Sequence, residues 1–462
     1  MRKYLLTSVA LLGLAIAGTA QAANFAPTDA FQNAGSSGAP KNTPEPGKII
    51  VRLSGLMAVD LGVVGSTANK SHVTNAKNQE FGMAGFFRLY FGVDGRMTNG
   101  IIYGANAEMR TNFAGSNPAG YPASTGIANS SANSSASTWY TRRAYAYIGA
   151  DQVGILRLGQ GDGPLSLLSG NSMGEFYDTG NWDGNACDLV SQGCVAWFFP
   201  DVGNEYASNK LAYISPKFAG FSFGASFAPS SAALSAAGSG TAIAGGNSSQ
   251  QTSSLASDVQ RPRNIFEIAG RYQGSVGPVG VDGMLGYSGS DVVGGTTGVF
   301  PASIGGGAVS KYYGLSVFDA GLTLSYAGFQ AFGHLTTGKM NGAFTPQAKL
   351  VSGRKQDGLA WTAGVAYGQG PWIVGAGYVQ NESQGANGPV GTGPATVGNR
   401  REVGVSVGGT YTLTPGVDLF LEYLYGMRHQ NGVNFRDGAA GIATADNQIT
   451  TNMLLGTVFI RW

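Results

Sequence analysis

The stretch from Thr141 to Tyr206 decides how this chain is interpreted. It opens with TRRAYAYIGADQVGILRLG (141–159) and continues as GDGPLSLLSGNSMGEFYDTGNWDGNACDLVSQGCVAWFFPDVGNEY (161–206). The first part is typical of two β-strands joined by a tight turn at Asp151–Val153. The second part is a 46-residue segment that holds seven acidic residues and neither lysine nor arginine. A loop of this length is usually functional or disordered, and its two cysteines and many aromatic residues indicate an ordered loop.

Apolar residues recur at every second position in many other segments. In KIIVRLSGLMAVDLGVVG (48–65), Ile49, Val51 and Leu53 share one face, and Arg52 and Asp60 share the other. Only 12% of the residues are charged, and 74 of the 462 are glycine. Few charges, much glycine and alternating strands predict an all-β fold, a transmembrane antiparallel β-barrel with lipid outside and water inside. A secreted β-sandwich or solenoid is the alternative, but the sequence shows no short repeat period.

Extending this pattern along the chain predicts sixteen strands, an even number as in single-chain bacterial barrels. Their expected ranges are 48–65, 79–94, 99–113, 138–150, 153–160, 207–216, 219–229, 262–275, 279–290, 307–319, 321–334, 356–369, 371–382, 399–413, 416–430 and 446–462. Short turns, expected near 95–98, 151–152, 217–218, 276–278, 320, 370 and 414–415, alternate with long loops. The last strand should close the barrel against the first. The loop at 161–206 is predicted to fold into the lumen and narrow it.

Aromatic residues beside the short turns are expected to point outward and form a belt at one membrane interface. They are Phe91, Tyr147, Phe221, Tyr367, Trp372 and Tyr411. Scattered core aromatic residues are the alternative.

The N-terminus carries the pattern of a secretory signal. Arg2 and Lys3 precede an apolar run of 13 residues at 5–17, and Ala20-Gln21-Ala22 predicts cleavage after Ala22. The run is shorter than the roughly 20 residues that span a membrane as a helix. Residues 23–47 are expected to be a flexible lead, or a small helix, before the barrel at 48–462. Cleavage would leave 26 basic and 26 acidic residues, since Arg2 and Lys3 come off the 28, and no nucleic-acid partner is suggested.

The stretch from Thr141 to Tyr206 also resembles the general porins of Gram-negative outer membranes. The matching residues are TRRAYAYIG (141–149), GILRLG (154–159), the acidic loop, SNKLAYISP (208–216) and FAGF (218–221). In that family they form strand, turn, strand, constriction loop and strand, and Trp462 resembles the aromatic end of the terminal strand. The resemblance implies a homotrimeric channel for the passive diffusion of small hydrophilic solutes and ions. A solute-specific channel and a non-conducting adhesin or scaffold barrel are the alternatives.

The predicted site is a charged constriction. Glu175 and Asp178 are the first choices on the acidic loop, facing Arg88 and Arg142, which have lumen parity near mid-height. The resemblance places Arg142 where such porins have a basic residue of the constriction. Two further arginines point inward, Arg52 lower and Arg110 higher. Neighbouring Arg143 has lipid-side parity in this interpretation. The alternative is that the arginines pair with nearby acids such as Asp60 or Asp94 and the loop acids bond to the loop backbone.

Cys187 and Cys194 are the two cysteines of the chain, and they lie in the same loop. In an oxidising compartment such a pair usually forms a disulfide. Two thiols alone do not complete a tetrahedral metal shell, so neither a metal nor a cofactor is expected.

An enzymatic function finds little support. The three histidines, His72, His334 and His429, fall near predicted loops or strand tops. Neither a Gly-x-Ser-x-Gly elbow nor a His-Glu-x-x-His motif occurs in the sequence.

Overall fold

The structure is a computed structural model of the 462-residue chain. It describes residues 44–67, 80–112, 139–170, 172–174, 182, 189, 194–195, 199, 208–230, 253–254, 262–292, 294–295, 312–340, 347, 357–385, 398–432, 435 and 447–462. The predicted signal and most of the predicted lead lie outside these residues, so both stay predictions.

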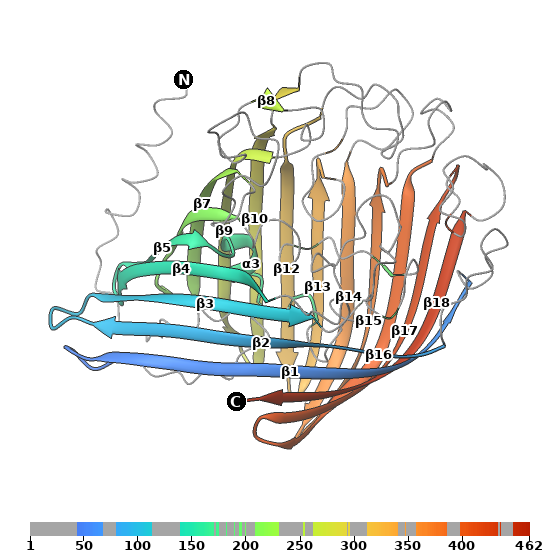
Figure 1. Ribbon diagram of the computed structural model, residues 1–462, viewed down its shortest axis with the longest axis horizontal. Coiled ribbons are helices and arrows are strands. Elements are labelled where there is room, and N and C mark those ends of the chain that lie inside the picture. The colour runs from blue at the N-terminus through green and yellow to red at the C-terminus, as the bar shows by residue number, and fades with distance from the viewer. Residues whose placement is uncertain are drawn as a thin grey trace.

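Sixteen strands of the described chain close into one antiparallel barrel (Figure 1). In chain order they are β1 (Ile49–Ser66), β2 (Phe81–Arg96), β3 (Ile102–Asn112), β4 (Tyr140–Ala150), β5 (Gly154–Gln160), β6 (Asn209–Ile214), β7 (Phe221–Ser230), β9 (Pro262–Val276), β10 (Val279–Val292), β12 (Ser316–Tyr326), β13 (Phe329–Gly338), β14 (Gly358–Gln369), β15 (Trp372–Ser383), β16 (Arg400–Thr414), β17 (Val417–Gln430) and β18 (Gln448–Arg461). β8 (Ser253–Ser254) and β11 (Gly294–Gly295) form a separate parallel pair. A short helix, α3 (Pro164–Leu167), follows β5.

The barrel closes by pairing its first strand with its last, as predicted. β1 and β18 are antiparallel, with Val59 opposite Val458 and Ser66 opposite Thr451. The C-terminal residue extends this ladder, because the backbone N–H of Trp462 donates to Gly55 and that of Gly55 donates back. The C-terminus therefore lies beside β1 (Figure 1).

No helix among the described residues is both long and apolar enough to cross a membrane.

Side-chain alternation along the strands separates an apolar outer face from a mixed inner face. On β1, the outward Ile49, Val51 and Leu53 are between 59% and 65% exposed, whereas the inward Arg52 and Asp60 are buried. A water-soluble monomer rarely exposes such a continuous apolar surface. The outer face is therefore suited to lipid, and the polar groups are kept inside.

One predicted turn is wrong. The sequence placed it at Ala320, between strands at 307–319 and 321–334, but β12 continues to Tyr326 and the chain turns at Ala327–Gly328. These two residues have φ values of 49° and 85°, as the tight hairpin turn with two left-handed residues requires. Ala320-Gly321 and Ala327-Gly328 are the same dipeptide, so local sequence does not distinguish them.

Candidate functional site

Three adjacent strands line one side of the lumen with guanidinium groups. β2 supplies Arg88 and β3 supplies Arg110, which lie directly opposite each other in the ladder. β4 supplies Arg142 and Arg143, both largely enclosed. We call these four residues the basic wall.

A β-bulge brings two consecutive arginines to the same face. Glu108 of β3 pairs with Arg143 of β4, but the next residue, Met109, pairs with Thr141, so Arg142 is the extra residue. A bulge shifts the side-chain parity of a strand by one position. The lipid-side parity predicted for Arg143 is therefore wrong, because its side chain is buried inside the barrel.

The same parity error misplaced one residue of the predicted aromatic belt. Tyr147 points inward and is buried, and its hydroxyl donates to Asp94. Phe91, Phe221 and Trp372, in contrast, are exposed on the outer face.

Glu108 is the centre of the charge network on the basic wall. Its carboxylate accepts from Arg110 and Arg143, and its Oε1 lies 3.6 Å from Nη1 of Arg142. Arg143 also binds Asp162, the first acid of the long loop, with 3.0 Å between Nη2 and Oδ1. Four guanidinium groups therefore face two carboxylates within the described residues. Buried ion pairs are tolerated where hydrogen bonds accompany them, and both Arg110 and Arg143 donate to Glu108.

Arg52 lies nearer the short turns, as predicted, and it is bonded to carboxylate and amide oxygens. Its Nη2 lies 3.0 Å from Oδ1 of Asp94 and 2.8 Å from Oδ1 of Asn106. This is the pairing that the sequence left open as the alternative for this arginine.

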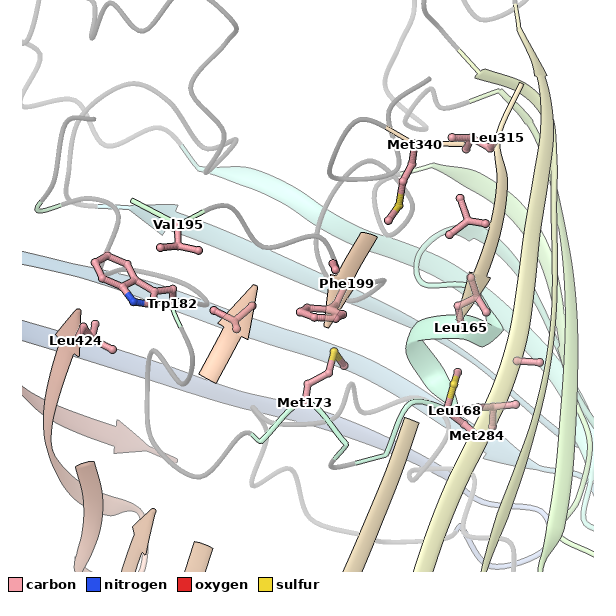
Figure 2. Close-up of a cluster of buried hydrophobic side chains, with 14 of the residues drawn as sticks. Leu165, Leu168, Met173, Trp182, Val195, Phe199, Met284, Leu315, Met340 and Leu424 are labelled. Carbon is pink, nitrogen blue, oxygen red and sulfur yellow. The ribbon is translucent and has the colours of Figure 1, made fainter. Parts of the chain in front are cut away.

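The loop after β5 runs through the barrel interior and contacts β13 and β17. Its described apolar residues, among them Leu165, Leu168, Met173, Trp182 and Phe199, belong to one buried cluster with inward side chains of the wall (Figure 2). Trp182 Nε1 donates to the carbonyl of Tyr425 on β17 at 3.0 Å. The predicted folding of this loop into the lumen holds for these residues, and apolar burial is what fixes it.

Polar contacts tie the same loop to two further places on the wall. Arg428 of β17 donates from Nη2 to the carbonyl of Cys194 at 2.6 Å. On the side of β12 and β13, Ser172 Oγ lies 2.8 Å from Nδ1 of His334, whose Nε2 lies 3.0 Å from Oδ1 of Asp319.

His334 lies mid-way along β13, fully buried, and not at a strand top as the sequence suggested. The serine, histidine and aspartate have the order of a hydrolytic triad. However, Ser172 is 2% exposed and its hydroxyl donates to the carbonyl of Ser169 at 2.7 Å. In this arrangement the three side chains tie loop to wall, and the serine is closed to solutes.

The family to which the chain belongs follows from its sequence as a whole. The profile described as Gram-negative porin matches residues 7–431. This chain belongs to the Gram-negative porins. The fold is accordingly that of an outer-membrane β-barrel channel. No curated protein matches the chain in sequence.

Solved structures resemble the porin over most of its length. The Salmonella typhi OmpF complex with daunomycin aligns with a TM-score of 0.52 at 12% identity, covering 89% of this chain and 97% of that one. An anion-selective porin from Comamonas acidovorans gives 0.51 at 14%, covering 90% and 100%. The outer membrane channel DcaP of Acinetobacter baumannii gives 0.50 at 11%, covering 91% and 100%. At such identities these likenesses concern the fold.

The structure locates part of the predicted site of this porin. Arg52, Arg88, Arg110 and Arg142 all face the lumen, whereas Glu175, Asp178 and Cys187 lie outside the described residues. Cys194 is disulfide-bonded, and its pairing with Cys187 stays a prediction. Sequence reasoning missed Arg143, Glu108 and Asp162 as partners in one network. The alternation of β3 indicated that Glu108 points inward, and the acid-rich loop contains Asp162, but no sequence pattern indicated the bulge.

Proposed function

We propose that this porin is a water-filled channel for the passive diffusion of small hydrophilic solutes and ions. The observation that carries the proposal is the basic wall, where Arg88, Arg110, Arg142 and Arg143 converge on the lumen at one level of the barrel. Water and ions can pass such a surface, because its charged groups hydrogen-bond to a solute as it loses hydration.

The constriction lies between the basic wall and the loop after β5. Trp182 and Phe199 hold the described part of that loop on β17 and β13, and we place the aqueous path on the arginine side. Glu175 and Asp178 are the acids that we assign to the loop side of this path. Opposite charges across a narrow path create a transverse field, which polar solutes can align with and apolar solutes cannot.

The test is single-channel recording in a planar lipid bilayer. The proposal expects stable open steps whose conductance rises with bulk salt concentration. A purified, folded barrel that adds no conductance would contradict it and would favour an adhesin or scaffold.

A homotrimer is proposed on the family resemblance of the sequence. Conductance steps that arrive and close in groups of three support it, and single steps with a monomer mass in native mass spectrometry oppose it.

Mass measurement of the mature protein tests the predicted cleavage after Ala22, which leaves Ala23 as the first residue.

A further inference from the structure

The lumen contains an apolar surface beside the basic wall. Inward-facing Leu56 and Ala58 of β1, Phe86 of β2 and Phe459 of β18 form a buried cluster. Tyr90 of β2 and Phe420 of β17 pack against it and are only partly buried. We call these six residues the aromatic arc. Its rings are in contact, with centroids 6.0 Å apart for Phe86 and Phe459 and 5.3 Å for Phe420 and Phe459.

The arc is unexpected on the inner face of an aqueous channel, where polar side chains are the rule. It lies nearer the short turns than the loop contacts do, since Phe420 precedes Leu424 and Arg428 on β17. Its partly buried members, Tyr90 and Phe420, therefore offer ring surface to the lumen below the loop, although Phe420 also packs against Phe332 of β13.

Arg88 joins the arc to the basic wall. Its guanidinium lies 4.0 Å from the ring centroid of Phe86, and its position in the ladder is opposite Leu56. Among the described residues Arg88 forms no ion pair, and its buried Nε has no hydrogen-bond partner. Arg143 differs, because two carboxylates satisfy it. Arg88 is thus the arginine of this wall that has no carboxylate partner among the described residues, and its side chain bonds to Tyr90 of the arc.

The acids nearest the arc are engaged by other groups. Asp60 accepts from Thr457 at 2.7 Å, and Asp418 accepts from Thr412 at 2.7 Å and from Arg461. Glu422, the next inward residue above Phe420, is buried. The positive charge beside the rings is therefore that of Arg88, which no carboxylate among the described residues pairs with.

We infer that the arc and Arg88 form a weak binding site for anions that carry an apolar ring, of which aromatic monocarboxylates are the simplest class. The carboxylate would meet the guanidinium of Arg88, and the ring would pack on Tyr90 and Phe420 and displace water from them. This inference rests on the proposed function, because it assigns a preferred solute to the same channel.

The experiment compares two monoanions that each carry a six-membered ring, benzoate and glucuronate. Reversal potentials in gradients of their sodium salts give the permeability ratio of benzoate to glucuronate for single channels. The expected ratio exceeds the ratio of their mobilities in free solution. In the double variant Phe420→Ser with Tyr90→Ser we expect the ratio to fall roughly threefold.

Two further variants separate the ring from the charge. Phe420→Leu keeps an apolar side chain at the same place and is expected to retain most of the preference. Arg88→Gln should lower the permeability of both anions. Heat-modifiable mobility on gels confirms that each variant is a folded barrel.

The outcomes distinguish this inference from the proposed function. The inference is overturned if the wild-type permeability ratio of benzoate to glucuronate equals the free-solution value, or if the serine substitutions leave it unchanged. Either result leaves the proposed channel function intact. Absence of any conductance overturns the proposed function and the inference together.

Discussion

The two halves of the barrel interior carry different chemistry on the same strand pattern. On β2 to β5 the inward residues include Arg88, Glu108 and Arg143, which form a charged network. On β12 to β18 the inward residues include Val379, Leu424 and Met453, which join the buried cluster of the loop. The first group of residues is suited to water, whereas the second packs against the apolar side chains of the loop, although the same strands also bury the ion pair of Glu402 with Arg428. The inward side chains of the wall therefore divide the lumen into two chemically different parts, and the loop adds to this division.

Glycines make the packed half possible at the points of closest approach. A Cβ added to Gly404 would lie 2.6 Å from Cδ1 of Trp182, and one added to Gly426 would lie 2.7 Å from its Cζ2. The indole can lie flat on the wall because these two positions have no side chain. The charged half has a close approach of the same kind, because a Cβ added to Gly92 would lie 2.7 Å from Nη2 of Arg52.

The largest expected effect comes from Trp182→Ala, which removes the main anchor of the packed half. The side chain is 1% exposed, and truncating a buried tryptophan costs about 3–5 kcal/mol. We expect a lower temperature of heat modification, higher conductance and more open-channel noise. Trp372→Ala on the outer face, where the ring is exposed, is the matched control. Equal effects of the two substitutions would show that Trp182 does not hold the loop.

A slightly smaller effect is expected for Arg143→Leu on the charged half. If Arg143 points inward, its replacement removes the bidentate partner of the buried Asp162 and one of the bases around Glu108. The barrel should then lose roughly 3 kcal/mol of unfolding free energy. If Arg143 faced the lipid instead, its replacement by leucine would make the barrel more stable. Denaturant-induced unfolding in detergent therefore reports the direction of this side chain by the sign of the change. A stabilised variant would contradict the bulge at Arg142.

Ser172→Ala should have a modest effect. It removes the hydroxyl that lies against Nδ1 of His334, and a buried hydrogen bond is worth about 1 kcal/mol. The temperature of heat modification should fall by less than in Trp182→Ala, and conductance should barely change. Ser230→Ala, at the end of a strand, serves as control. A conductance change as large as that of Trp182→Ala would mean that the polar tie outweighs the apolar contacts.

The smallest effect on the barrel is expected for the disulfide. Mass spectrometry of the non-reduced protein should find Cys187 and Cys194 linked, since both lie in one exported loop. Replacing both by serine should change the unfolding of the barrel little, because the closed ring is short. Two alkylatable thiols in the mature protein would refute the pairing.

Strand number, closure and most side-chain directions could be predicted from the sequence, because one buried polar face and one apolar face fix the parity of each strand. The bulge could not, since Thr-Arg-Arg-Ala is compatible with either parity. The turn at Ala327–Gly328 was missed because an identical dipeptide occurs seven residues earlier. The route of the loop depends on apolar contacts between residues far apart in the chain, such as Trp182 and Leu424, and no local pattern reports these.

The central claim is that solutes pass between the basic wall and the acidic loop. Reversal potentials of two double variants in a salt gradient test it most directly. Glu175→Gln with Asp178→Asn should shift permeability toward anions, and Arg88→Ala with Arg142→Ala should shift it toward cations and raise conductance. Both shifts should shrink with salt, as the Debye length falls from roughly 30 Å at 0.01 M to 3 Å at 1 M. Shifts in the same direction, or none at low salt, would contradict the claim.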